Sequence, residues 1–99
     1  MLYVIIGRDR ENSLTKRLEI RPSHLDRIDP LVKEGRIVVA GPMPNVDSEN
    51  PGEAGFSGSL IVAEFDSIQE ARAWAEADPY MTEGVFERVD VYPFKQVLP

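Results

Sequence analysis

The sequence predicts one α+β domain, residues 1–99, in which a ferredoxin-like βαββαβ order of elements forms a four-stranded antiparallel sheet. Two observations predict this class. Strand-like and helix-like runs follow one another in that order, and no linker or internal repeat interrupts them. The length of 99 residues suits one domain, and a hydrophobic content of 42% is enough for its core. Strands that are apolar on both faces belong at the centre of a sheet, which predicts the strand order 4-1-3-2.

The first strand is predicted over 2–7, where the run LYVIIG is apolar on both faces. A polar stretch follows, and Ser13 is a candidate cap for a helical segment that continues to residue 19. Pro22 predicts a break, because the residue before proline disfavours the α region and proline suits the first helical position. A second helical segment is therefore expected over 22–34, with a kink at Pro30, which has no N–H to donate.

The second half of the chain contains the remaining elements. They are a strand over 36–43, a loop over 44–57, a strand over 58–65, a helix over 67–78 and a strand over 85–92. The pattern SIQE at 67–70 is a capping box, which predicts the start of the helix, and Pro79 predicts its end. A loop as long as 44–57 is uncommon in so small a domain, and such loops are often lids or binding loops.

Composition excludes several classes of function. Seventeen acidic residues against eleven basic ones give a net charge of −6, and nucleic-acid binding normally needs a basic face, so we expect no nucleic-acid partner. The absence of cysteine excludes disulfides and thiol catalysis. With one histidine, a transition-metal site would depend on carboxylates, so we expect neither a metal nor another cofactor. No membrane-length apolar run and no secretory signal are visible, so we expect a cytoplasmic protein without a membrane partner.

The predicted helices are too few to cover both faces of the predicted sheet. Two helices cover one face only, yet residues such as Tyr3, Ile5, Leu60 and Val62 imply that both faces are apolar. An uncovered apolar sheet face is typical of an association surface. We therefore predict a homodimer in which two sheets face each other, with room for a ligand cavity between them. The alternative is that the long loop and the C-terminal tail cover the second face.

His24, the only histidine, is the first candidate for chemistry. At helical spacing it lines up with Leu25 and Ile28 and therefore faces inward. Asp78 closes the apolar stripe of the second predicted helix, and the topology brings these two helix ends together beneath the loop over 44–57. A carboxylate bonded to one imidazole nitrogen fixes the tautomer and leaves the other nitrogen as a general base. His24 and Asp78 are therefore the predicted catalytic pair.

Both members of the pair also have a structural interpretation. Asp78 precedes Pro79, so its side chain is suited to cap a short turn over 79–83. A single inward-facing histidine is often a hydrogen-bonded core residue. These interpretations stay open at the level of sequence.

Four residues are candidates for substrate binding. Arg17 and Arg21 lie four positions apart on the approach to His24 and are spaced to hold an anion, although such arginines are often solvated or paired with acidic residues. Tyr80 and the long loop are placed to close a pocket. No nucleophile-elbow pattern surrounds Ser59, which we expect to contact the substrate.

Several short motifs together resemble the YciI family over essentially the whole chain. They are Lys16-Arg17-Leu18, Arg21-Pro22-Ser23-His24-Leu25, Gly35-Arg36, Ala40-Gly41-Pro42-Met43-Pro44, Gly55-Phe56-Ser57-Gly58-Ser59, Ala75-Glu76-Ala77-Asp78-Pro79-Tyr80 and Pro93-Phe94-Lys95. The resemblance implies a dimeric α+β barrel of ferredoxin-like subunits, with a cleft whose acid–base pair falls on His24 and Asp78. Similar folds include muconolactone isomerases and cofactor-independent monooxygenases, and a YciI-like dehydrochlorinase acts on chlorinated hydroxyquinols.

Two functions from different classes follow. The first is a small cytoplasmic enzyme, lyase- or isomerase-like, in which His24 abstracts a proton from a small metabolite and Asp78 orients it. The second is a non-catalytic ligand-binding or regulatory homodimer, in which His24 only hydrogen-bonds a metabolite. If the pair is structural instead, His24→Ala should chiefly lower the melting temperature.

Overall fold

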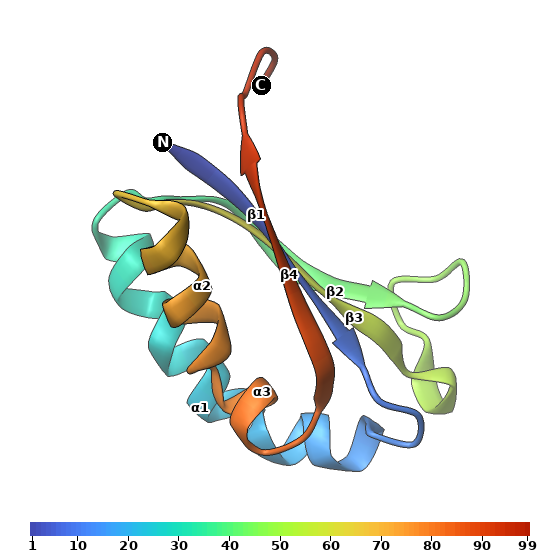
Figure 1. Cartoon of the computed structure of the whole chain (residues 1–99). Coiled ribbons are helices and arrows are strands. Elements are labelled where there is room, and N and C mark those ends of the chain that lie inside the picture. Colours follow the sequence, from blue (N-terminus) through green and yellow to red (C-terminus); the bar gives the residue numbers. More distant parts are fainter.

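A computed structural model describes residues 1–99 as a four-stranded antiparallel sheet with its helices on one face (Figure 1). The elements in chain order are β1 (Leu2–Asp9), α1 (Leu14–Lys33), β2 (Ile37–Pro44), a short 3-10 helix (Gly52–Ala54), β3 (Phe56–Glu64), α2 (Ile68–Glu76), α3 (Pro79–Thr82) and β4 (Phe86–Phe94). The spatial order β2-β3-β1-β4 confirms the predicted ferredoxin-like arrangement. None of the helices combines the length and the apolar character that crossing a membrane requires.

β1 lies inside the sheet and pairs antiparallel with both β3 and β4. Its Val4 stands opposite Val62 of β3 on one side and Tyr92 of β4 on the other. Side chains alternate between the two faces of a strand, so Tyr3 and Ile5 point the other way, toward the helices, and both are buried. The predicted central position of the first and third strands is therefore correct.

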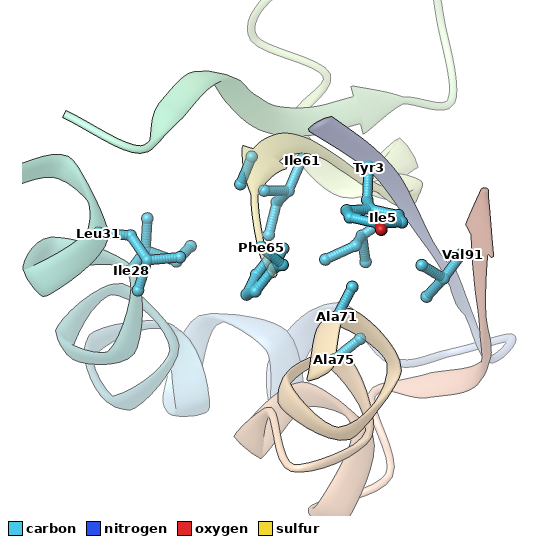
Figure 2. Close-up of a cluster of buried hydrophobic side chains, with 10 residues drawn as sticks. Tyr3, Ile5, Ile28, Leu31, Ile61, Phe65, Ala71, Ala75 and Val91 are labelled. Carbon is cyan, nitrogen blue, oxygen red and sulfur yellow. The ribbon is translucent and has the colours of Figure 1, made fainter. Parts of the chain in front are cut away.

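The hydrophobic core fills the space between the sheet and the helices α1 and α2 (Figure 2). Its ten buried members are Tyr3, Ile5, Ile28, Leu31, Ile61, Ala63, Phe65, Ala71, Ala75 and Val91. A smaller cluster of Tyr80, Val85 and Phe86 lies under α3, next to the site described below. Alanines on the inner face of α2 let that helix approach the sheet closely, while α1 contributes larger aliphatic side chains.

The predicted break at Pro22 is wrong, because α1 is one continuous helix of 20 residues. Pro22 and Pro30 both lie inside it and both are exposed. The carbonyls that these prolines leave without a backbone donor belong to Leu18 and Asp26, also on the exposed side, where water can bond them. The buried residues on the opposite face hold the helix against the sheet. Ser13 precedes α1 as expected, but its side chain makes no cap bond.

The connection between β2 and β3 is shorter than the predicted loop over 44–57. β2 continues through Pro44 and β3 begins at Phe56, and the 3-10 helix takes up part of the span between them. The Asn45 side chain donates a hydrogen bond to the Ala54 carbonyl at 2.9 Å, so the loop closes on itself beside the sheet. The capping box at Ser67 is confirmed, since its hydroxyl accepts a hydrogen bond from the Glu70 N–H.

The face of the sheet opposite the helices carries apolar side chains that nothing in the chain covers. We refer to this surface as the open face, and its exposed members include Val39 of β2 and Tyr92 and Phe94 of β4, which are 51%, 54% and 38% exposed. The alternative that the loop and tail cover it is wrong. Residues 95–99 leave the sheet beyond the end of β4 rather than fold across it (Figure 1).

Candidate active site

His24 and Asp78 meet in the folded chain, although 54 positions separate them. His24 Nδ1 lies 2.9 Å from Asp78 Oδ1 and 2.8 Å from Oδ2, and the two residues are only 6% and 2% exposed. α1 directs the imidazole inward, and the turn between α2 and α3 presents the carboxylate to it. An ionised carboxylate only accepts hydrogen bonds, so Nδ1 carries a hydrogen, and a neutral imidazole with that tautomer has its lone pair on Nε2.

Asp78 also has the structural role that its sequence context predicts. Its Oδ1 accepts a hydrogen bond of 2.8 Å from the Tyr80 N–H, and Pro79 occupies the first turn of α3, so Asp78 is the N-cap of that helix. The cap and the contact with His24 coexist, because a carboxylate accepts several hydrogen bonds. The cap fixes the carboxylate in place, and its orientation toward His24 follows from that.

Tyr80 supports His24 from behind and does not close a pocket. Its ring stacks on the imidazole, with ring centroids 4.0 Å apart and planes 12° from parallel, and the residue is 1% exposed. Burial raises the pKa of the Tyr80 phenol above its ordinary value, while the positive charges of Arg17 and Arg21 oppose that shift. The expectation that Tyr80 helps to close the pocket is wrong, because α3 packs it into the small core cluster with Phe86.

Arg17 is buried and tied to a carboxylate that the sequence analysis did not single out. Its Nε donates to Asp9 Oδ2 at 2.8 Å and its Nη2 donates to Asp9 Oδ1 at 2.9 Å, while the two side chains are 5% and 3% exposed. Nη2 also donates to Ser59 Oγ at 2.9 Å. The guanidinium carbon lies 4.7 Å from the centroid of the Tyr80 ring, so Arg17 and His24 both contact the same tyrosine.

A cavity of about 170 Å³ lies between α1 and the strands β2 and β3. We call it the site cavity, and its lining residues are Arg17, Arg21, His24, Leu25, Ile28, Ala40, Gly41, Pro42, Ser59 and Ile61. Four of the predicted site residues therefore share one cavity, with Asp78 and Tyr80 behind His24. The long loop contributes nothing to this lining, so the prediction that the pair lies beneath it is wrong. The loop instead borders a separate hollow of about 330 Å³ beside the start of α1.

The polar side chains of the site cavity include two arginines and no carboxylate. His24 bonds only through Nδ1, and every solvent-excluded side-chain nitrogen or oxygen of the protein has a partner, so Nε2 is open to the cavity. Arg21 is exposed and makes no salt bridge or side-chain hydrogen bond, so its charge is free for a ligand. The cavity thus offers one lone pair beside guanidinium groups, with Leu25 and Ile28 as an apolar wall. Such a donor set suits a small anion better than a metal ion.

Sequence reasoning missed Asp9 and the aromatic residues around Arg17. The guanidinium carbon of Arg17 lies 5.3 Å from the Phe56 centroid and 5.9 Å from the Phe86 centroid. Asp9 ends the first strand, after an apolar run and Arg8, and an acidic residue at that position is a signal for a partner. The sequence does not say which of the nearby basic residues that partner is.

The fold and the site cavity define a class of protein, namely small ferredoxin-like domains with a buried histidine–aspartate pair. Comparison with known proteins supports the ferredoxin-like fold and identifies the family. The family model described as the YCII-related domain matches residues 1–95. The Escherichia coli protein YciI is 58% identical over 97 residues, which cover 98% of this chain and 99% of that protein. The chain belongs to the YciI family.

Two solved structures extend the comparison. The 5-chloro-2-hydroxyhydroquinone dehydrochlorinase TftG from Burkholderia phenoliruptrix, solved in complex with 2,5-dihydroxybenzoquinone, is 29% identical, with a TM-score of 0.82 over 96% of this chain and 94% of that one. A dimeric ferredoxin-like protein from Jannaschia, covering 96% and 98% of the two chains, is 16% identical with a TM-score of 0.51 and shows the shared fold alone.

Proposed function

We propose that this protein is a small enzyme in which His24 and Asp78 carry out acid–base chemistry, by proton abstraction or elimination, on a small anionic metabolite. The observation that carries the proposal is the position of His24. Its Nδ1 faces a buried carboxylate, and its Nε2 opens onto a cavity lined by two arginines. A group held in one tautomer with its basic nitrogen free is suited to act as a general base near neutral pH.

In the proposed step, His24 Nε2 takes a proton from an O–H or C–H bond of the ligand. The electron pair of that bond moves into the ligand and either expels an anionic leaving group or, in an isomerisation, is reprotonated at another atom by the same imidazole. After an elimination the imidazolium returns its proton to solvent. Asp78 stabilises the positive charge that forms on His24, and Arg21 lies where it can stabilise negative charge on the ligand.

The substrate class follows from the lining and from one relative. A cavity of about 170 Å³ with an apolar wall and the unpaired guanidinium of Arg21 fits a compact anion with an apolar side. The similarity to TftG, a dehydrochlorinase bound to a dihydroxybenzoquinone, supports an oxygen-rich ring compound as the first substrate to test. This likeness transfers a hypothesis and not a reaction.

The test compares wild type with His24→Gln, which cannot act as a base, and with Ser23→Ala, a control on the exposed neighbour of His24. Chloride release from 5-chloro-2-hydroxyhydroquinone and the Kd for 2,5-dihydroxybenzoquinone are measured for each. We expect His24→Gln to lose turnover by about 10²–10⁴-fold while the Kd changes little. Equal rates for wild type and His24→Gln, including no rate above buffer for either, would contradict the enzyme and favour a ligand-binding protein.

We also propose that the protein functions as a homodimer that pairs through the open face. The exposed residues Val39, Tyr92 and Phe94 lie on one side of the sheet, and a second copy presents the same apolar surface. Light scattering coupled to size exclusion tests this proposal. Tyr92→Glu should give monomers, whereas Leu18→Glu, on the exposed side of α1, should not. A monomeric wild type, or a dimer that survives Tyr92→Glu, would contradict it.

A further inference from the structure

We infer that Asp9, which lies outside the site cavity, is a positioning residue that holds Arg17 so that Arg17 and Ser59 form a two-donor binding site for a ligand oxygen near His24. This inference rests on the proposed function and deepens it, since it assigns the part of the cavity that receives negative charge on oxygen. Asp9 is not among the residues that line the cavity, whereas Arg17, Ser59 and His24 all are.

The hydrogen bonds of Arg17 show which of its donors remain for a ligand. A guanidinium group has five N–H donors, and three of them are used within the protein. Nε and one hydrogen of Nη2 bond to Asp9, and the other hydrogen of Nη2 bonds to Ser59. Both hydrogens of Nη1 are left without an acceptor, although the residue is only 4% exposed. No solvent-excluded side-chain nitrogen lacks a partner, so Nη1 is open to the cavity that Arg17 lines.

Ser59 supplies the second donor because of the direction of its bond to Arg17. Its Oγ accepts a hydrogen bond from Nη2 at 2.9 Å, so the hydroxyl hydrogen must point elsewhere. The bond from Arg17 is the one side-chain hydrogen bond in which Ser59 takes part, so the hydroxyl donates to no group of the protein, and Ser59 lines the cavity. A ligand oxygen is therefore the partner that the Ser59 hydroxyl and Nη1 of Arg17 both lack.

Asp9 makes two of the three hydrogen bonds that orient the guanidinium, and Ser59 accepts the third. The rings of Phe56, Tyr80 and Phe86 surround the cation, but ring faces do not set its rotation. The two parallel bonds to Asp9 do, because a bidentate arginine–carboxylate pair is planar and directional. Asp9 itself is anchored at the end of β1 with its side chain 3% exposed.

The charge of the pair also indicates the kind of oxygen that binds. Asp9 neutralises Arg17, so this corner of the cavity offers strong hydrogen-bond donors without a full unpaired charge. Such a corner suits a carbonyl oxygen that becomes an oxyanion when His24 removes a proton, more than an oxygen that is fully charged from the start. The free charge of Arg21 is then left for a permanent anionic group of the ligand.

The test measures the Kd of 2,5-dihydroxybenzoquinone by calorimetry for wild type, Asp9→Asn, Ser59→Ala and the double variant. Asp26→Asn, an exposed residue of α1, is the control for the loss of one carboxylate. We expect each single variant to weaken binding by about ten- to a hundred-fold and the double variant to weaken it little further, because both act through one oxygen site. The Arg17 Nε–H resonance in NMR spectra should be sharp in wild type and Ser59→Ala, and should broaden in Asp9→Asn.

Several outcomes would overturn the inference. They are no binding by wild type, unchanged binding by Asp9→Asn or Ser59→Ala, or fully additive losses in the double variant. If Asp9→Asn does not fold, Ser59→Ala and the conservative Asp9→Glu still test the inference. Ser59→Ala leaves the ion pair intact and should nevertheless lose affinity for the quinone. Asp9→Glu should bind the quinone more tightly than Ser59→Ala does. Failure of the proposed function would give a different result. The quinone would bind and the variants would weaken its binding as stated, but His24→Gln and wild type would turn over substrate equally.

Discussion

Replacing Asp78 by asparagine or by alanine separates its two roles, because only one of them needs the negative charge. Asparagine keeps a carbonyl oxygen that can accept the hydrogen bond from the Tyr80 N–H and so preserves the cap of α3. Its amide NH₂ then faces His24 Nδ1, which must change from donor to acceptor. The imidazole hydrogen therefore moves to Nε2, and the cavity loses its base. Alanine removes both contacts.

The structure gives the expected magnitudes. In Asp78→Ala the loss of the cap costs about 1 kcal/mol, and the buried N–H of His24 left unpaired costs about 1–3 kcal/mol. The sum of about 2–4 kcal/mol lowers Tm by about 10–20 °C for a domain of this size. In Asp78→Asn both hydrogen bonds keep a partner, so we expect the loss to stay within about 1 kcal/mol.

The assay combines thermal unfolding with ¹⁵N NMR of the imidazole ring. Ser67→Ala, which removes the cap of α2 at a distance from the site, is the control and should cost about 1 kcal/mol without changing the ring resonances. In Asp78→Asn the ¹⁵N chemical shifts should show that the hydrogen of the His24 ring has moved from Nδ1 to Nε2. Turnover should fall as in His24→Gln. Equal Tm losses for the two Asp78 variants, or a ring still protonated at Nδ1 in Asp78→Asn, would refute the reasoning.

Three further predictions concern the surroundings of the pair. Burial raises the pKa of the Tyr80 phenol, so the stabilisation that this raised pKa gives is complete below about pH 10 and is lost as pH rises through the folded-state pKa. In urea titrations at alkaline pH, Tyr80→Phe should therefore flatten the fall of the unfolding free energy with pH, and an unchanged dependence on pH would contradict this. A methyl group at Gly7 would collide with the Phe86 ring, so Gly7→Ala should lower the free energy of unfolding by about 1–3 kcal/mol and alter the near-UV circular dichroism. An unchanged spectrum would show that the Phe86 ring is not held against Gly7. Arg21→Ala should keep the unfolding free energy within about 0.5 kcal/mol of wild type but weaken quinone binding and reduce its dependence on salt concentration. An equal dependence on salt in wild type and variant would count against Arg21 as the anion contact.

The fold was predictable because the pattern of apolar residues is strong and local. Strands that are apolar on both faces identify the centre of the sheet, and the βαββαβ order then fixes the topology. The break at Pro22 was not predictable in the same way, since local preference favours an interruption there. Whether a proline stops a helix depends on tertiary packing and on whether the orphaned carbonyl reaches water. For α1, burial of residues such as His24 and Ile28 outweighs the lost hydrogen bonds.

The contact between His24 and Asp78 was predicted from helical periodicity, which places both residues on inward faces. The predicted meeting of two helix ends was wrong, because His24 lies in the middle of the continuous helix α1. The partner of Arg17 was not predictable. Several basic and acidic residues surround Asp9 in sequence, and charge alone does not select one pair among them. Burial selects it, since Asp9 and Arg17 are both almost fully enclosed while their charged neighbours such as Arg8 and Glu11 are exposed.

The site contains two buried aspartates, and each determines what a basic residue can offer to the cavity. Asp78 accepts the hydrogen bond from His24 Nδ1, so Nε2 is left as an acceptor. Asp9 accepts two hydrogen bonds from Arg17, so Nη1 is left as a donor. Neither aspartate lines the cavity. Removal of a proton from a ligand creates negative charge on a neighbouring atom, so a catalyst needs an acceptor and a donor side by side in fixed orientations. In the proposed mechanism the two aspartates provide that arrangement from outside the cavity, and the unpaired charge of Arg21 attracts the anion although the chain has a net charge of −6.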